Sequence, residues 1–288
     1  MRIKSYFLIA FCLGIVCLQT EIIYPQVYGF SNQIGKFKEA ASFAYSPSGF
    51  IYVTDSGTNE VYKLDTLGNV LKSAGGYGWD QGLFDIPSGI SANPLSVYVC
   101  DKNNHRIERF DKDLNYIWLL STHNSDTTAQ RFGYPLGCAI SQQGDMYILD
   151  SENKRIVKFD FSGNFSLNFG GYDAGEYALS NPQGIAISNS NNILVTDGKQ
   201  IVIFDQYGSG TGIIKSNDEL KGISIVFNML TVNSDSAVYF YNLNSQDPAL
   251  SKLKLNGLDR KPEITGSFIF NNKLYLLTKE TILVFNKI

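Results

Sequence analysis

The sequence has little of what most enzymes and nucleic-acid-binding proteins use. Its 288 residues include only two histidines, and 24 Lys and Arg against 27 Asp and Glu give a formal net charge of −3. Nucleic-acid binding rewards a concentrated basic surface, so this balance argues against that role. There is no CxxC pair, no phosphate-cradling glycine loop and no evident Ser–His–Asp pattern. The sequence therefore offers no catalytic constellation.

Long apolar runs are also missing, apart from one at the N-terminus. Arg2 and Lys4 precede an apolar run over residues 6–18. This is the layout of a secretory signal peptide, and it is short for a membrane span. We predict a signal peptide over residues 1–20, with a lipid anchor at Cys17 or an uncleaved anchor as alternatives. The protein would be exported, that is periplasmic, extracellular or associated with the cell envelope, with no membrane span after signal removal.

Cysteine is scarce, with four in the chain, and two of these lie in the leader. The other two, Cys100 and Cys138, lie in predicted strands. A disulfide is allowed in an exported protein. Because each stands where other repeats have an ordinary strand residue, we expect both to pack as small apolar groups.

What the chain does contain is a repeated hairpin, clearest over residues 146–160 (MYILDSENKRIVKFD). Two short strands rich in Val, Ile, Tyr and Phe flank a polar turn. The Asp that ends the first strand recurs with spacings of 46, 49 and 47 residues, at Asp55, Asp101, Asp150 and Asp197. A fixed period of this length indicates a repeat architecture.

Further strands complete each unit. One precedes the hairpin, as in Pro87–Ala92, and one follows it and ends in glycines, as in Val70–Gly76. Two weaker copies follow residue 205, and the sixth unit ends before its fourth strand. Gln26–Phe30 supplies a candidate for that strand. We therefore predict an all-β fold with six four-stranded antiparallel blades, closed by the N-terminal strand completing the last blade.

The pattern resembles the NHL-repeat family of β-propellers. The resemblance rests on Pro-x-Gly-Ile/Cys, Tyr-Val/Ile-x-Asp, Asn-x-Arg-Ile and Phe-Asp, clearest in Pro87–Asp111 and Pro135–Asp160. It implies one propeller domain over residues 21–288, in an exported protein of bacterial type. Some NHL propellers bind RNA, a role that the acidic composition and the leader argue against here.

The recurring Asp, Asn and Arg of each hairpin are expected to hold turns and neighbouring blades, since they occur once per unit. A site is expected instead on the face that carries the turns between second and third strands and the connections between blades. Phe84, Phe132 and Tyr177 share one repeat position and are expected to fill space between blades. The predicted ligand-binding residues on this face are Tyr77, Trp79, Asp80, His105, His123, Tyr134, Tyr172 and Asp173.

Two functions remain open. The first is a binding or scaffold module for a protein, peptide or glycan in the cell envelope, acting as a monomer without cofactor or metal. The second is a metal-dependent lyase or hydrolase, because amidating lyases, streptogramin lyases and gluconolactonase-like propellers are similar in shape. His105 and His123 with Asp80 or Asp126 could then bind the metal. His105 also fills a variable turn position, matched here to Glu60 and Lys154, which favours a solvated turn residue.

Overall fold

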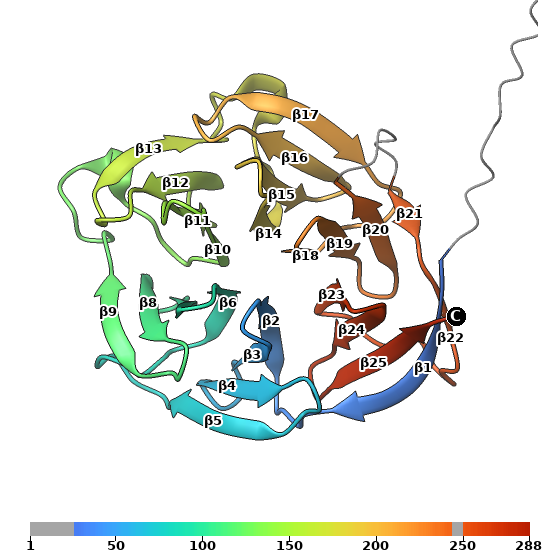
Figure 1. Cartoon of the computed structure of the whole chain (residues 1–288). Coiled ribbons are helices and arrows are strands. Elements are labelled where there is room, and N and C mark those ends of the chain that lie inside the picture. The colour runs from blue at the N-terminus through green and yellow to red at the C-terminus, as the bar shows by residue number, and fades with distance from the viewer. Residues whose placement is uncertain (1–25, 244–249) are drawn as a thin grey trace, which may run out of the picture.

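Six sheets stand in a ring around a central axis in the computed structural model, which describes residues 26–243 and 250–288 (Figure 1). The predicted signal peptide, residues 1–20, lies outside the described residues. Within the described ranges, no helix is long and apolar enough to cross a membrane. Two short 3-10 helices, Thr128–Gln130 (η1) and Gly175–Tyr177 (η2), lie in connections between blades.

The first four blades each contain four consecutive strands, here called a to d from the axis outward. Blade one is formed by β2 (Ala40–Ser46), β3 (Phe50–Asp55), β4 (Glu60–Asp65) and β5 (Val70–Gly75). Blade two is formed by β6 (Pro87–Ala92), β7 (Ser96–Asp101), β8 (Arg106–Asp111) and β9 (Tyr116–Leu120). Blade three is formed by β10 (Gly137–Ile140), β11 (Met146–Asp150), β12 (Arg155–Phe159) and β13 (Phe165–Phe169). Blade four is formed by β14 (Pro182–Ile187), β15 (Ile193–Asp197), β16 (Gln200–Phe204) and β17 (Gly210–Lys215).

Blade five keeps this order but has a very short outer strand, and blade six departs from it. Blade five is formed by β18 (Gly222–Val226), β19 (Met229–Asn233), β20 (Val238–Asn242) and the two-residue β21 (Ser251–Lys252). Blade six is a five-stranded sheet of β23 (Gly266–Phe270), β24 (Lys273–Leu277), β25 (Ile282–Lys287), β1 (Val27–Ile34) and β22 (Lys254–Asn256).

The N-terminal strand closes the ring, as predicted from the sequence. β1 pairs antiparallel with β25, with Tyr28 opposite Lys287, and the two lie side by side in Figure 1. Thr281 Oγ1 also donates to the carbonyl oxygens of Ile34 and Gly35, at 3.0 and 3.1 Å. The sequence did not predict β22, which pairs parallel to β1 and covers its outer edge. One residue separates β22 from β21, so the chain runs directly from blade five onto the edge of blade six.

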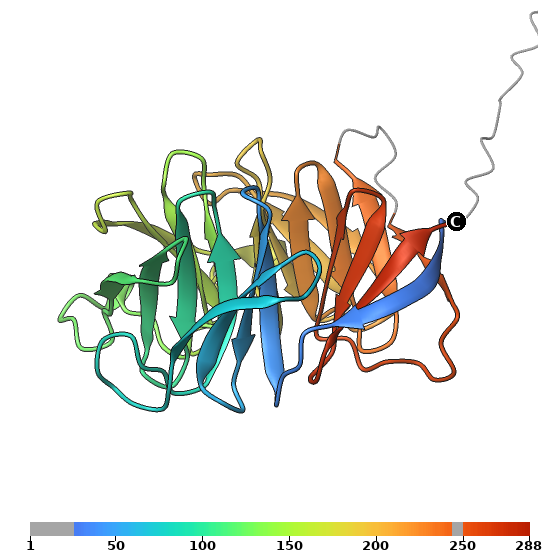
Figure 2. The same cartoon turned by 60° about the horizontal axis from the view of Figure 1, so that its bottom comes forward.

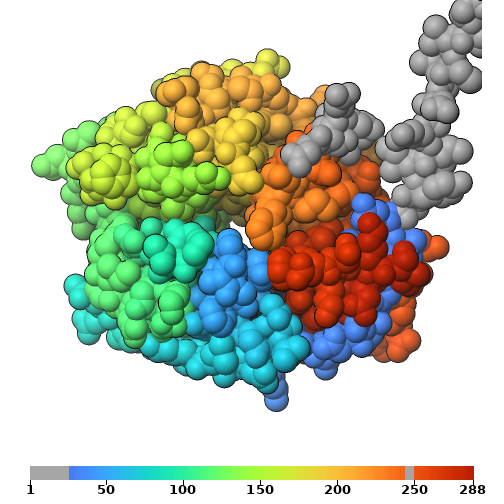
Figure 3. Space-filling view, in the orientation of Figure 1, coloured from blue at the N-terminus to red at the C-terminus, as the bar shows by residue number. Residues whose placement is uncertain are grey.

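Burial follows position in the blade. All six residues of β7 are buried, because a strand b is packed between the neighbouring blades on both of its faces. Four of the six residues of β5 are exposed, because a strand d forms the outer wall. The alternation of faces along each strand sends successive side chains into the cores on either side. The core is therefore divided among the junctions between blades. In Figure 3 the blades appear as coloured sectors packed around the axis.

The cysteine prediction is confirmed. Cys100 and Cys138 are free and buried, and both belong to the apolar cluster between blades two and three. Cys138 Sγ lies 3.9 Å from the carbonyl oxygen of Tyr98. Burial raises the pKa of the Cys100 thiol well above its usual value, and this thiol therefore behaves as an apolar core group.

The antiparallel order defines two faces of the ring, which Figure 2 shows from the side. The connections from strand d to the next strand a and the turns from b to c emerge on one face, here called the loop face. The turns from a to b and from c to d emerge on the other, here called the turn face. All eight predicted ligand-binding residues lie in segments of the loop face.

Candidate functional site

The loop face is uneven around the ring. Its three longest connections cover residues 76–86, 121–136 and 170–181, and they join blades one to four. The connections before blades one and five are short, residues 35–39 and 216–221. The candidate residues therefore lie over one part of the ring, where chain is available to build a recognition surface.

A buried carboxylate anchors each of the first two of these connections. Asp101 ends β7, is fully buried and accepts hydrogen bonds from the Asp85 backbone N–H at 2.8 Å and from Asn104 Nδ2 at 2.7 Å. Arg106 Nε donates to the same carboxylate at 2.8 Å. Burial raises the pKa of Asp101, and the three donors act in the opposite direction. This contact pattern gives Asp101 a structural role.

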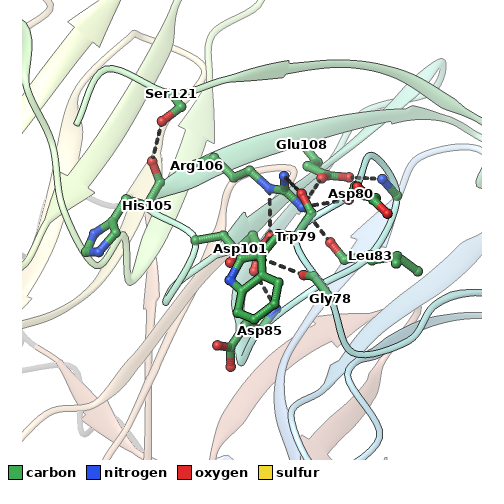
Figure 4. Close-up of polar contacts among 12 residues, drawn as sticks. Gly78, Trp79, Asp80, Leu83, Asp85, Asp101, His105, Arg106, Glu108 and Ser121 are labelled. Atoms are coloured by element: carbon green, nitrogen blue, oxygen red, sulfur yellow. Dashed lines mark hydrogen bonds and ion pairs between the residues drawn. The ribbon is translucent and has the colours of Figure 1, made fainter. Parts of the chain in front are cut away.

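Arg106 extends from this carboxylate to the connection before its own blade (Figure 4). Its Nη1 donates to the carbonyl oxygen of Trp79 at 2.6 Å, and its Nη2 donates to those of Asp80 and Leu83 at 2.9 and 2.7 Å. Five donors in a fixed plane allow one guanidinium to hold several carbonyls, which lysine cannot do. The backbone of the connection is thus fixed while its side chains remain free to face solvent.

Blade three repeats the arrangement. Asp150 accepts from the Gly133 backbone N–H at 3.1 Å, Asn153 Nδ2 at 2.8 Å and Arg155 Nε at 3.2 Å. Arg155 Nη2 then donates to the carbonyl oxygens of Thr128 and Arg131 at 3.1 and 2.8 Å. The repeated Asp, Asn and Arg hold the connections, as the sequence indicated.

Two aromatic side chains project from the connection that Arg106 holds. Tyr77 is 62% exposed and Trp79 is 69% exposed, and their rings pack edge to face at 5.8 Å between centroids. Asp80 is exposed beside them. Exposed aromatic groups on a fixed backbone bind ligands at a low entropic cost.

A second group lies over the junction of blades two and three. The rings of His105 and His123 stack with centroids 4.0 Å apart, and the Tyr134 ring meets His105 edge-on at 4.3 Å. The Tyr134 backbone N–H donates to His105 Nδ1 at 3.1 Å. His123 Nδ1 lies 4.0 Å from Glu152 Oε2. Beside them lies an open groove of about 530 Å³, lined by His123, Asn124, Thr128, Arg131, Glu152 and Asn153.

The remaining candidates lie apart from these two groups. Tyr172 is 98% exposed and Asp173 is exposed beside it, in the connection between blades three and four. Phe84 and Phe132 are fully buried between blades, as predicted. Tyr177 is half-buried, with its ring 6.4 Å from that of Phe204.

The match of His105 to Glu60, made from the sequence, is wrong. Strand pairing places Glu60 opposite Asp55 and Arg106 opposite Asp101, so Glu60 corresponds to Arg106. The counterpart of His105 is therefore Asn59, one residue earlier, and Lys154 is the third member of this position.

The metal site considered from the sequence is not assembled. Across residues 26–243 and 250–288, no three His, Cys, Asp or Glu side chains are grouped as a metal site requires. The Nδ1 of His105 already accepts a backbone hydrogen bond. The axial cavity, of about 480 Å³, has no charged side chain among the described residues that line it, which are chiefly small or apolar groups of the first strands.

A buried carboxylate, Glu108, was missed. It is fully buried in β8, where blades one, three and four have Tyr62, Val157 and Val202. Arg106 Nη2 lies 2.8 Å from Glu108 Oε1 as an ion pair, although that oxygen receives no well-directed hydrogen bond, and the Gly82 N–H donates to Oε2 at 3.0 Å. Burial outweighs Arg106 and raises the pKa of Glu108 to about 7. The sequence feature that could have identified Glu108 was a carboxylate at a repeat position that is otherwise apolar.

Exposed apolar groups on the turn face were missed as well. They are large side chains at the tips of a-to-b or c-to-d turns, one in each of blades one to five. The set is Leu67, Leu95, Phe161, Tyr207 and Phe227. They lie on separate turns and do not contact one another as Tyr77 and Trp79 do, although Phe227 stacks on Phe270 of blade six at 6.2 Å between ring centroids.

The curated relatives of the chain are large proteins. It is 29% identical over 140 residues to the protein brain tumor of Drosophila melanogaster, covering 47% of this chain and 13% of that protein. It is 29% identical over 139 residues to the B-box type zinc finger protein ncl-1 of Caenorhabditis elegans, covering 47% and 16%. Both are NHL-repeat proteins. The chain thus spans less than a fifth of the length of either, and no family model matches it.

Solved structures share the fold across most of the chain. A gluconolactonase from Xanthomonas campestris has a TM-score of 0.64 at 13% identity, covering 88% of this chain and 87% of that one. A catalytically inactive virginiamycin B lyase from Staphylococcus aureus has a TM-score of 0.61 at 15% identity, covering 86% and 80%. At these identities the likeness shows the fold alone.

Proposed function

We propose that the chain is an exported, NHL-type propeller that acts as a binding or scaffold module in the cell envelope. Its ligand is a protein, peptide or glycan, held by the loop face over blades one to four. The NHL-repeat proteins among its relatives support the module type, and the apolar run over residues 6–18 supports export.

The observation that carries this proposal is the exposed aromatic pair on a backbone fixed from below. Arg106 binds three carbonyls of the connection 76–86, and the rings of Tyr77 and Trp79 remain more than half exposed. Preorganised aromatic side chains of this kind are typical of recognition surfaces. The charge of the chain argues against a nucleic-acid ligand.

The test compares the two faces of the ring. Full-length protein would be crosslinked in cell-envelope preparations and applied to a glycan array, as wild type, Tyr77→Ala/Trp79→Ala and Leu95→Ser. We expect the first variant to lose any bound species and the turn-face variant to retain it. Equal binding by all three proteins, or loss only in Leu95→Ser, would move the site away from the loop face.

A second function is a metal-dependent lyase or hydrolase, suggested by the two histidines, His105 and His123, whose rings stack on the loop face. It predicts near-stoichiometric metal in protein purified without chelators, and metal-dependent turnover of lactones or esters. Loss of that metal in His105→Ala/His123→Ala would support this function, whereas unchanged metal content would remove these residues as ligands.

A further inference from the structure

Two connections of the loop face contain a residue with an unusual backbone conformation directly before a proline. Ile86 precedes Pro87 with φ of 57°, and Tyr134 precedes Pro135 with φ of 46°. Positive φ is rare outside glycine, most of all for β-branched or bulky residues. A following proline itself favours an extended conformation at the residue before it. Such strain persists only where neighbouring groups hold it in place.

In both connections the group that holds the strained residue is a side chain of a b-to-c turn. The Ile86 N–H donates to Asn59 Oδ1 at 2.9 Å, and the Tyr134 N–H donates to His105 Nδ1 at 3.1 Å. Asn59 and His105 occupy the same position in blades one and two, each with positive φ, at 56° and 51°. One side chain of the preceding blade thus fixes the residue before the proline that leads into the next blade.

The third connection provides the contrast. Lys154 occupies the same position in blade three with φ of 51°, but an ammonium group offers no acceptor. The residue before the next proline, Asn181, does not have positive φ, and its N–H donates to Asp197 instead. Among these three described junctions, the strained conformation occurs only where the turn supplies an acceptor.

Asparagine and histidine differ as acceptors because only histidine takes up a proton near neutral pH. Accepting the Tyr134 N–H requires a lone pair on Nδ1, so His105 is neutral with its proton on Nε2. Protonation turns Nδ1 into a donor and removes the acceptor that holds Tyr134. The Asn59 amide does not titrate, so the connection of Ile86 has no such sensitivity.

The surroundings of His105 favour the neutral ring. His123, from the connection between β9 and β10, stacks on it at 4.0 Å, and Glu152, from the turn between β11 and β12, is the opposing charge. Burial, followed by His123, lowers the pKa of His105 below its usual value of 6.5, and Glu152 acts in the opposite direction. The hydrogen bond is therefore present at neutral pH and is lost as the pH falls below the ordinary histidine range.

We propose that His105 is a positioning residue that makes the presentation of Tyr134 on the loop face dependent on protonation. With His105 neutral, Tyr134 keeps its strained backbone and its ring stays against the imidazole, 42% exposed. With His105 protonated, the connection relaxes and the ring leaves this position. Building on the proposed function, a ligand that contacts the Tyr134 ring is bound near neutral pH and released in mild acid.

The test observes the Tyr134 amide directly and needs no ligand. Full-length protein labelled with ¹⁵N-tyrosine gives at most 17 tyrosine amide signals, and the signal missing in Tyr134→Phe identifies Tyr134. We expect this signal to titrate between pH 8 and 5 with the midpoint of the His105 ring, below 6.5. His105→Asn, which copies Asn59, should keep the neutral-pH shift and abolish the titration. His105→Lys, which copies Lys154, should show the displaced signal at every pH.

Controls separate this inference from its alternatives. The Ile86 amide in ¹⁵N-isoleucine protein should not titrate, and His123→Asn should leave a titration that still follows His105. A Tyr134 signal that is independent of pH, or one that titrates equally in His105→Asn, would overturn the proposal. Because no ligand is used, that result would leave the binding role of Tyr77 and Trp79 untouched. Failure of the binding test would equally leave this titration intact.

Discussion

Blades one to four differ from blades five and six in how the connections between blades are held. In the first four, an aspartate at the end of strand b accepts backbone N–H groups from the connection entering its own blade, as Asp55 does from Lys38 and Glu39 at 2.7 and 2.8 Å. Blade five has Asn233 at this position, and blade six has Leu277. Asn233 instead contacts the connection entering the next blade and acts as a donor, since its Nδ2 donates to the carbonyl oxygen of Ile264 at 3.2 Å.

This difference distinguishes contacts that support the loop face from contacts that close the ring of blades. Asp101, Asp150 and Asp197 lie under the long connections that carry the exposed aromatic residues, and they fix those connections to the scaffold, whereas Asp55 holds a short one. The last two blades lack such connections and are joined by chain pairing, through β1 and β22. The regular blades therefore depend on buried polar contacts, and the closing blade depends on apolar packing and strand order.

The largest expected effect is in the regular blades. Asp101→Ala leaves the buried Arg106 without its main partner and the Asp85 N–H without an acceptor. Removing one member of a buried ion pair costs about 3–5 kcal/mol in the free energy of unfolding. Urea unfolding would measure this cost, with the exposed Asp173→Ala as the control expected to stay within about 0.5 kcal/mol. A loss below about 1 kcal/mol for Asp101→Ala would show that the carboxylate does not support the blade.

In the closing blade, the matching test removes an apolar group of β1. Tyr28 is 1% exposed and belongs to the cluster with Phe285 and Val238, so Tyr28→Ala should cost about 3–4 kcal/mol. Phe30→Ala on the same strand is the control, because Phe30 is 37% exposed and should lose about 1 kcal/mol. Equal losses would mean that the strand closes the ring by backbone pairing alone.

Exchanging the side-chain amide of Asn233 for a carboxylate, and the carboxylate of Asp197 for an amide, tests the two kinds of blade against each other. Asn233→Asp places a carboxylate oxygen against the Ile264 carbonyl, and it should cost about 2–3 kcal/mol. Asp197→Asn can still accept from the Ser180 N–H through its amide oxygen, so it should cost only about 1 kcal/mol. Thermal unfolding at pH 7 would rank them, and the reverse order would contradict the assigned polarity.

The last expected effect concerns pH and Glu108. Its pKa rises from the ordinary 4.5 to about 7 on folding, so the folded state binds more protons than the unfolded state between these values. The contribution of Glu108 to the free energy of unfolding is therefore complete below pH 4.5 and is lost as the pH rises through about 7. The unfolding free energy of wild type relative to Glu108→Gln should fall by more than about 1 kcal/mol between pH 4.5 and 8. A constant difference across this range would show that Glu108 keeps an ordinary pKa.

Much of the fold could be read from local pattern. The Asp period gave the regular blades, and the segment before Gly35 matched the end of a fourth strand well enough to predict closure. Exposure of Tyr77, Trp79, Tyr134 and Tyr172 also followed from their place in glycine-rich connections. What failed was register at one turn, where Glu60 was matched to His105 although strand pairing assigns Asn59. The pairing of β22 with β1 had no pattern in the sequence at all.

By itself, the sequence determined the repeating hairpin, the number of blades and the face that carries the long connections. These follow from strand periodicity and turn residues, which act over a few neighbours along the chain. Tertiary structure alone decided that Arg106 holds the carbonyls of residues 79, 80 and 83, that Glu108 is buried beside it, and that His105 accepts the Tyr134 N–H. Each of these contacts joins segments brought together by the path of a connection between blades. That path depends on how the blades pack, and no local pattern encodes it.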